Sequence, residues 1–240
     1  MFIPVFLVKS KPFLPPYPDF FAIARQVRYN ADIRVFRKST TLFQAIGEIV
    51  MSKKIVAIDM DDTICHLVPK AIHYHNAAYP DLQLSIDQVS SFDLSTIWHP
   101  DCNEEIFFGR PKLYEELEIF DEHTIEEVRR ISEEHDVIIV TAARPSAVPE
   151  KWNWLQQHMP FIPFENFFVA KRKYLLEFDL LIDDGPHNLL AARDAGKRTI
   201  GIPRPWNLPL QSEFLMKDSW DGMGELVNRV LSGPGFPVKG

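Results

Sequence analysis

Short apolar runs that alternate with helical stretches constrain the fold of this chain more than any other feature of its sequence. The runs occupy residues 55–58, 137–140, 167–169, 180–182 and 199–202. Runs of this length and composition are typical of strands buried on both faces of a sheet. Between the first two, Ile125, Val128 and Ile131 recur at a spacing of three among charged residues, which predicts an amphipathic helix over 122–135. Further helices are expected over 150–159 and over 188–195, where Gly196 ends the pattern. The alternation predicts an α/β fold with a mostly parallel, doubly wound sheet.

The composition of the 240 residues excludes several classes of protein. Hydrophobic residues make up 46% and charged residues 25%, which is ordinary for a globular protein and excludes wholesale disorder. The 26 Lys and Arg against 33 Asp and Glu give a net charge of −7, so we expect no nucleic-acid partner. With only Cys65 and Cys102, no disulfide framework is implied. Apolar runs stay well below the roughly 18 residues of a membrane span, so we expect a protein without membrane contact, located in the cytoplasm.

Residues 1–50 differ from the rest of the chain. They hold seven basic and three acidic residues, a net charge of +4, and five prolines. An Arg-containing leader poor in acidic residues is compatible with an organelle transit peptide, but the expectation that we favour is a poorly ordered N-terminal extension. Met51 stands just before the first apolar run and resembles a natural beginning.

Polar side chains gather where the predicted strands end. Asp59 and Asp61 follow the first run, Thr141 the second, and Asp183 and Asp184 the fourth, while a loop with Lys171 and Lys173 follows the third. In an open α/β sheet, ligands bind at this carboxyl edge. Carboxylates placed close together repel one another unless a cation compensates. Because the candidate ligands are oxygen atoms and no zinc-type Cys/His spacing occurs, the predicted cation is Mg²⁺.

These residues carry a resemblance to a known superfamily. Asp59-Met60-Asp61-Asp62-Thr63 resembles the D-x-D-x-T first motif of the haloacid dehalogenase superfamily of phosphohydrolases. Val140-Thr141-Ala142 resembles its second motif, Lys173 its third and Leu181-Ile182-Asp183-Asp184 its fourth, in the expected order. The resemblance spans residues 54 to about 205 and implies a Rossmann-like core.

Within this superfamily the chain is most similar to the 5'(3')-deoxyribonucleotidases, the C-type 5'-nucleotidases and their bacterial relatives. The stretches 58–61, 150–155 and 179–184 carry the likeness. The resemblance implies a small, mainly helical cap at residues 66–120, inserted between core segments 51–65 and 121–240. Gly185 stands where some eukaryotic members have Arg, and the cap sequence matches loosely, which leaves the substrate open.

The resemblance also implies a role for each motif residue. Asp59 would be the nucleophile that forms an aspartyl-phosphate, and Asp61 would act as the general acid and base. Because Asp59 and Asp61 are two positions apart, both side chains lie on one side of an extended segment. Thr141 and the Ala142 N–H would bind the phosphoryl group, together with Lys173. The metal would be held by Asp59, the Asp61 carbonyl and Asp184, with Asp183 as a second ligand or an orienting group.

Several residues have alternative interpretations. Asp62 fits a turn better than a ligand, and Thr63 fits local hydrogen bonding. Lys171 competes with Lys173 for the third motif, and Arg144 fits either a phosphate contact or a loop cap. The histidines near the cap, His66, His73 and His75, fit surface or hydrogen-bonded polar positions better than the role of an acid.

The cap bears on the identity of the substrate. It is rich in aromatic residues, and most of them are expected to form its core. Phe92 and Trp98 are the candidates for stacking on a nucleobase. We therefore predict a Mg²⁺-dependent phosphomonoesterase for a small phosphate ester, with a nucleoside monophosphate as the preferred substrate. The alternatives are a phosphatase for another ester, such as a sugar phosphate, and a non-catalytic phosphate-binding scaffold.

Overall fold

The computed structural model of the chain describes residues 53–103 and 105–233. The chain divides into two units, residues 1–51 and 52–240, and the description concerns the second unit. The expectations for residues 1–50 therefore lie outside the described residues.

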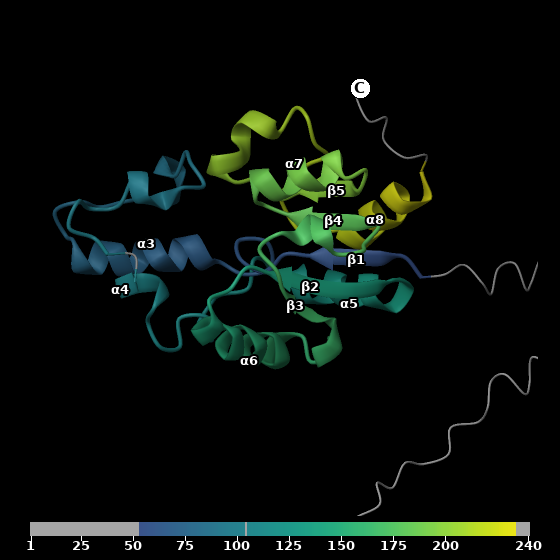
Figure 1. Cartoon of the computed structure of the whole chain (residues 1–240), viewed down its shortest axis with the longest axis horizontal. Helices are drawn as coiled ribbons and strands as arrows, with labels where there is room; N and C mark the ends of the chain where they lie inside the picture. The colour runs from purple at the N-terminus through teal and green to yellow at the C-terminus, as the bar shows by residue number, and fades with distance from the viewer. Residues whose placement is uncertain (1–52, 104, 234–240) are drawn as a thin grey trace, which may run out of the picture. The chain divides into compact units, whose positions relative to one another are not determined.

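Five parallel strands form one sheet in the order β3-β2-β1-β4-β5 (Figure 1). The strands are β1 (Ile55–Ile58), β2 (Asp136–Thr141), β3 (Phe167–Val169), β4 (Leu180–Asp183) and β5 (Arg198–Gly201). β1 lies in the middle, where Ile58 is in register with Ile139 of β2 and Ile182 of β4. The predicted α/β fold with a parallel sheet is confirmed. Because β1 and β4 are neighbours, the acidic residues at their carboxyl ends meet.

Helices cover both faces of the sheet, and the alternation of side chains along each strand explains how. Val56 and Ile58 are fully buried in one cluster with residues of three helices. These helices are α5 (Thr124–Glu134), α6 (Val148–His158) and α8 (Met223–Ser232). Ala57 faces the opposite side and packs in a smaller cluster with Ala192 of α7 (Pro186–Asp194). The middle strand β1 is therefore apolar at every position, as a sheet covered on both faces requires.

Helix α7 begins two residues before its predicted start. Pro186 occupies its first turn, where a missing N–H costs no hydrogen bond and the fixed φ favours the helix. The helix ends at Asp194, and Gly196 follows with a φ of 74°, in the left-handed region that glycine adopts readily. The predicted stop at Gly196 is thus confirmed.

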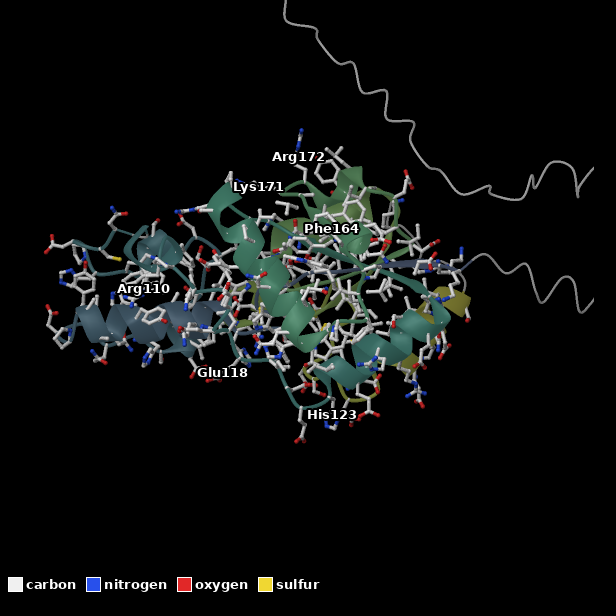
Figure 2. All side chains as sticks on the ribbon, turned by 90° about the horizontal axis from the view of Figure 1, so that it is seen from below. Arg110, Glu118, His123, Phe164, Lys171 and Arg172 are labelled. Atoms are coloured by element: carbon white, nitrogen blue, oxygen red, sulfur yellow. The ribbon has the colours of Figure 1, made fainter. Side chains whose placement is uncertain are left out.

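Residues 66–120 connect β1 to α5, and we call them the cap. They contain α3 (Leu67–Ala78), α4 (Glu105–Phe108) and two short 3-10 helices. The cap has its own hydrophobic cluster, which includes Ile72, Trp98 and Phe107. Its two ends lie side by side, because His66 N donates to Glu118 O at 2.9 Å and Phe120 N donates to Ile64 O at 3.0 Å. Figure 2 shows Glu118 at this junction.

The helices of the described residues are too short or too polar to cross a membrane. The expected cytoplasmic location stays a prediction.

Candidate active site

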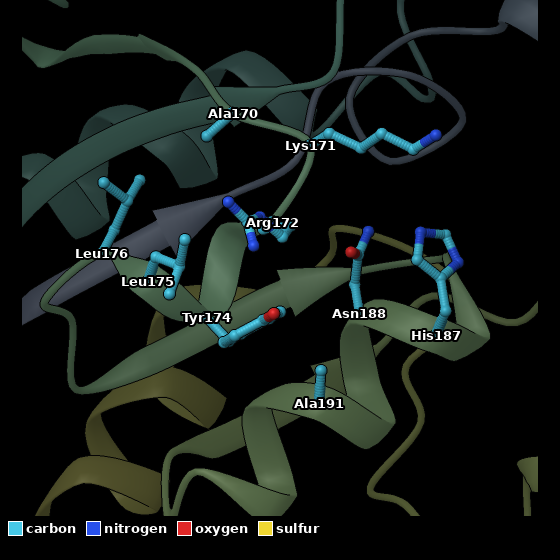
Figure 3. Close-up of a pocket in the computed structure, with 9 residues that line it drawn as sticks. All are labelled: Ala170, Lys171, Arg172, Tyr174, Leu175, Leu176, His187, Asn188 and Ala191. Carbon is cyan, nitrogen blue, oxygen red and sulfur yellow. The ribbon is translucent and has the colours of Figure 1, made fainter.

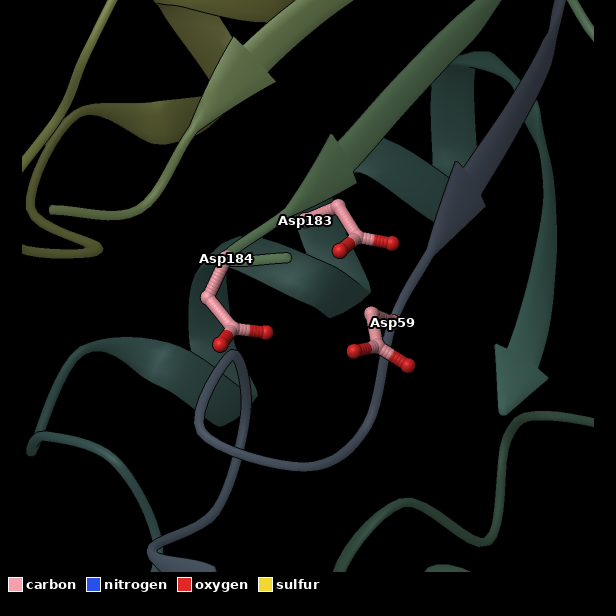
Figure 4. Close-up of side chains that lie close together, drawn as sticks. All are labelled: Asp59, Asp183 and Asp184. Atoms are coloured by element: carbon pink, nitrogen blue, oxygen red, sulfur yellow. The ribbon is translucent and has the colours of Figure 1, made fainter. Parts of the chain in front are cut away.

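Three buried carboxylates meet at the carboxyl edge of the sheet. Asp59 directly follows β1, Asp183 ends β4, and Asp184 comes next (Figure 4). One oxygen atom from each carboxylate lies within 4.8 Å of the others. Parallel pairing of β1 with β4 explains this arrangement, because it brings both strand ends to one edge. The structure therefore brings together three of the predicted metal ligands and leaves the Asp61 side chain outside the cluster.

Lys173 lies between two of these carboxylates. Its Nζ is 2.6 Å from Asp59 Oδ1 and 2.7 Å from Asp183 Oδ2, and its side chain is 2% exposed. Burial opposes the charge of this lysine, but Asp183 and Asp59 together raise its pKa. Lys171 is exposed. Of the two candidates for the third motif, Lys173 is thus the one in contact with the predicted nucleophile.

Asp183 and Asp184, at the end of β4, are buried in surroundings that disfavour their negative charge. Burial raises the pKa of Asp183 to about 6, with Asp59 adding to the shift and Lys173 opposing it. Burial, followed by the charges of Asp59 and Asp183, raises the pKa of Asp184 well above its usual range. A cation held by these oxygen atoms would relieve both shifts.

The donor atoms agree with such a cation. The buried Asp59, Asp183 and Asp184 offer carboxylate oxygens close to one another, and oxygen ligands of this kind suit Mg²⁺.

Lys151 holds the Asp61 side chain. Its Nζ donates to Asp61 Oδ2, to Thr141 Oγ1 at 2.8 Å and to Ala142 O at 3.0 Å. The lysine is fully buried, whereas Asp61 Oδ1 is buried without a hydrogen-bond partner among the described residues. Burial raises the pKa of Asp61, and Lys151 opposes that shift. One oxygen of Asp61 is thus held by Lys151, and the other makes no hydrogen bond among the described residues.

Sequence reasoning missed Lys151. The sequence pattern predicts a helix over 150–159 but assigns no role to this lysine, yet one signal was available. Lys151 shares a helix face with Trp154 and Leu155, which are both fully buried, because residues at i, i+3 and i+4 lie on one side of a helix. A lysine on the apolar face of a helix is rarely buried without a partner.

The second motif divides into a buried and an accessible part. Thr141 is fully buried at the end of β2, and its hydroxyl accepts the bond from Lys151 and donates to Ala142 O at 3.3 Å. Ala142 is among the residues that line the cavity next to Asp59. The structure therefore places Ala142 at the cavity and Thr141 beneath it, in contact with the lysine that holds Asp61.

The loop after β1 is held by local bonds. Asp62 has a φ of 54°, and both of its carboxylate oxygens accept the Val68 N–H at 3.1 and 3.2 Å, in the first turn of α3. This geometry agrees with a turn residue, as predicted for Asp62. Thr63 reaches further than expected, because its hydroxyl donates to Asp184 Oδ1 at 3.3 Å.

A cavity of about 260 Å³ lies over the carboxylates. The core contributes Asp59, Asp61, Lys173 and Asp184, and the cap contributes Phe92, Leu94 and Phe108. A wider groove of about 710 Å³ adjoins it and shares Lys171, His187 and Asn188 with the cavity (Figure 3). Arg172, at the rim of this groove, extends away from the body of the protein (Figure 2).

The two predicted base-binding residues occupy different places. Phe92 is 51% exposed, lines the cavity and contacts the His187 ring at a centroid distance of 4.7 Å. Trp98 instead packs inside the cap against His75 and Phe107, and it is 7% exposed. The expectation that Trp98 lines the site is corrected: its large apolar ring contributes to the core of the cap.

The surroundings of Gly185, where some eukaryotic members of the family have Arg, leave little space for a side chain. A Cβ atom at this position would lie 3.0 Å from Asn188 Nδ2 and 3.2 Å from His187 Cε1. Asn188 donates to both oxygens of Asp183, at 3.1 and 3.2 Å. In this chain the space next to residue 185 is thus filled by two side chains of α7.

Comparison with solved structures shows the fold. The chain is similar to a haloacid dehalogenase family hydrolase from Deinococcus radiodurans, solved with bound phosphate and sodium, with a TM-score of 0.56 and 13% identity over 76% of this chain and 98% of that one. A haloacid dehalogenase-like protein of unknown function from Agrobacterium tumefaciens has a TM-score of 0.56 and 10% identity, covering 74% and 98% of the two chains.

Comparison with curated proteins points to one group of relatives. The chain is 30% identical over 143 residues to a 5'(3')-deoxyribonucleotidase from Clostridium acetobutylicum, covering 58% of this chain and 77% of the relative. It is 29% identical over 140 residues to a 5'(3')-deoxyribonucleotidase from Bacillus subtilis, covering 57% and 79%. The family model described as 5' nucleotidase, deoxy (pyrimidine), cytosolic type C protein matches residues 53–231, a range that includes every motif residue of the site. The predicted class, a phosphoric monoester hydrolase with a haloacid dehalogenase fold, is confirmed, and the chain belongs to the cytosolic type C family of 5' nucleotidases.

Proposed function

We propose that this protein is a Mg²⁺-dependent phosphomonoesterase that removes phosphate from deoxynucleoside monophosphates. The observation that carries the proposal is the position of Asp59 at the cavity, with its carboxylate paired to Lys173 and two further carboxylates beside it. The curated relatives named 5'(3')-deoxyribonucleotidase support the nucleotide as substrate.

Asp59, Asp183 and Asp184 would hold the metal, together with the Asp61 carbonyl that the family resemblance assigns to it. Mg²⁺ takes one or two carboxylates directly and completes its octahedron with water and phosphate oxygens. Asp59 and Asp184 fit the direct ligands, because both oxygens of Asp183 already accept hydrogen bonds from Lys173, Gly185 and Asn188. When bound, the ion supplies positive charge that polarises the phosphoryl group.

The reaction proceeds in two displacements. An Asp59 carboxylate oxygen forms a bond to phosphorus while the phosphorus–oxygen ester bond breaks, and Asp61 gives its proton to the leaving oxygen of the nucleoside. Asp61 then takes a proton from water as the water oxygen attacks phosphorus, which breaks the bond to Asp59 and releases inorganic phosphate. Lys173 compensates negative charge on the phosphoryl oxygens.

Lys151 keeps Asp61 ready for both steps. It occupies Asp61 Oδ2 and leaves Oδ1 without a partner among the described residues, so that Oδ1 is the atom that carries the proton. Because burial raises the pKa of Asp61, its protonated form persists to a higher pH than in an exposed carboxyl group.

Selectivity for a nucleotide would come from the cap. The chemistry at Asp59 involves only the phosphoryl group, so that discrimination depends on contacts with the rest of the substrate. Phe92 offers an accessible ring at the cavity, and stacking on an aromatic ring contributes about 1–3 kcal/mol per base.

The test is phosphate release from a panel of deoxynucleoside monophosphates, sugar phosphates and phosphoglycolate, with Mg²⁺ and with EDTA. We expect deoxynucleoside monophosphates to have the highest kcat/KM and EDTA to abolish turnover. If a sugar phosphate has the highest kcat/KM, the protein is not a nucleotidase, but the proposal that it is a phosphatase stands. Absence of turnover on the whole panel, with phosphate still bound, would favour the scaffold.

A further inference from the structure

A segment that the proposed chemistry does not use lies directly against its metal ligands. Residues 204–207 follow β5 and form the N-cap and first residues of the short 3-10 helix Pro205–Leu210. Three of their side chains reach the site, namely those of Arg204, Trp206 and Asn207. Sequence reasoning did not single out this segment.

Trp206 contacts the carboxylate of Asp184, one of the proposed metal ligands. Its Nε1 donates to Asp184 Oδ2 at 2.8 Å, and Trp206 is 5% exposed. The other oxygen of that carboxylate, Oδ1, accepts from the Thr63 hydroxyl at 3.3 Å. An indole N–H donates one bond and accepts none, so Trp206 orients Asp184 without competing for a metal ion.

The ring of Trp206 belongs to the cap cluster. Val68, Ile72 and Phe107 of the cap are members of the same buried cluster, although Trp206 itself comes from the core, and Trp206 also lines the cavity. One side chain therefore touches the metal ligand, the apolar interior of the cap and the space for the substrate.

Its neighbours hold this tryptophan in place. Asn207 Nδ2 donates to Asp184 O at 2.8 Å and to Ile202 O at 2.7 Å. Arg204 donates through Nε and Nη2 to Asp62 O, at 2.9 and 2.7 Å. The segment is thus tied to both strand ends that carry the acidic residues.

We infer that Trp206 is a positioning residue that orients Asp184 for the metal ion and couples this ligand to the packing of the cap. The inference rests on the proposed metal-dependent function. Hydrogen bonds to metal ligands from outside the coordination shell typically change metal affinity or activity by about 10–100-fold. Coupling between two sites is reciprocal, so metal binding should also stabilise the cap.

The first test measures the affinity for Mg²⁺ alone by calorimetry on the EDTA-treated, full-length protein. Trp206→Phe keeps an aromatic ring and removes the N–H, and we expect its Kd for Mg²⁺ to rise about tenfold. Trp98→Phe is the matched control: Trp98 lies in the same cluster, but its Nε1 has no hydrogen-bond partner among the described residues. An equal Kd for Trp206→Phe and wild type, or an equal rise in both variants, would overturn the inference.

Absence of Mg²⁺ binding to the wild type would instead reject the proposed metal-dependent function. Should Trp206→Phe fail to fold, the wild-type protein still permits a test. Its indole N–H groups can be observed by ¹⁵N NMR, with signals assigned through Phe variants at the other four tryptophans. We expect Mg²⁺ to shift the Trp206 signal and to leave that of Trp98 in place, and the opposite result would refute the role of Trp206.

The link to the cap is tested by hydrogen exchange. Mg²⁺ should slow amide exchange in α3 of the wild type and of Trp98→Phe by several-fold, and the effect should be lost in Trp206→Phe. Equal slowing of α3 in all three proteins would show that the metal acts on the cap by another route.

Discussion

The ammonium group of Lys173 lies 2.6 Å from Asp59 Oδ1 and 2.7 Å from Asp183 Oδ2. One buried cation thus joins the predicted nucleophile of β1 to the last residue of β4. A second buried lysine, Lys151, does the same for Asp61 and Thr141. In the site, two buried lysines therefore hold carboxylates from different segments in fixed positions. The effect of a substitution on stability and activity should depend on which carboxylate loses its partner.

Lys151→Met is expected to destabilise the protein by about 2–4 kcal/mol, because it leaves the partly buried Asp61 without its ionic partner. The double variant Lys151→Met/Asp61→Asn should recover part of this loss, since a neutral amide costs less to bury. Chemical denaturation measures both effects. Lys171→Met, at an exposed lysine, is the control and should change the stability by no more than about 0.5 kcal/mol. A Lys151→Met variant as stable as this control would contradict the pairing.

Asp184→Asn and Asp61→Asn should respond differently to added metal. Asp184→Asn removes one of the carboxylates proposed to hold the metal and should weaken Mg²⁺ binding, so a high Mg²⁺ concentration should restore part of kcat. Asp61→Asn removes a proton donor and acceptor that no metal concentration replaces, so that turnover should stay near background. Steady-state rates over a Mg²⁺ titration separate the two. Rescue of Asp61→Asn alone would mean that the roles are reversed.

Phe92→Ala should narrow the preference for nucleotides. The ring is exposed at the cavity, so its removal should leave the fold intact while kcat/KM for deoxynucleoside monophosphates falls about five- to 150-fold. The rate on an aryl phosphate should fall less. Trp98→Phe, inside the cap, should not change the ratio of the two rates. A ratio unchanged in Phe92→Ala would argue against stacking at this position.

Asp62 gives the metal-free protein a specific pH dependence. Burial raises its pKa from 3.8 to about 7 in the folded state, so the folded protein binds the proton more tightly than the unfolded chain. This contribution to stability is fully present below pH 3.8 and is lost as the pH rises through about 7. Asp62→Asn, which keeps an oxygen to accept the Val68 N–H, should lose that dependence.

Urea denaturation in EDTA at several pH values measures this effect. The stability of Asp62→Asn relative to wild type should increase between pH 4 and pH 7 and then level off. A constant difference across this range would show that Asp62 is ionised with an ordinary pKa.

The sequence predicted the parts of the site that lie on strand ends. Apolar runs located β1 and β4, and parallel pairing then placed Asp59, Asp183 and Asp184 together. Lys173 followed from its motif position. These predictions succeeded because the geometry of a parallel sheet determines which residues share its carboxyl edge.

The contacts that cross between elements were not predictable in the same way. Lys151 reaches Asp61 from α6, and Trp206 reaches Asp184 from the 3-10 helix that follows β5. Both contacts depend on how those segments pack on the sheet. The high aromatic content of the cap did not distinguish Phe92, at the cavity, from Trp98, in the cap cluster. Composition indicates that an apolar core exists, but the tertiary packing decides which rings form it.

The most direct test of this account is to trap the phosphoenzyme. The protein would be mixed with ³²P-labelled deoxynucleoside monophosphate and Mg²⁺, quenched in acid within the first turnover, and digested for peptide mapping. The account predicts a hydroxylamine-sensitive label on the peptide that contains Asp59, and its absence from Asp59→Asn. A label on another residue, or phosphate release from Asp59→Asn at the wild-type rate, would contradict it.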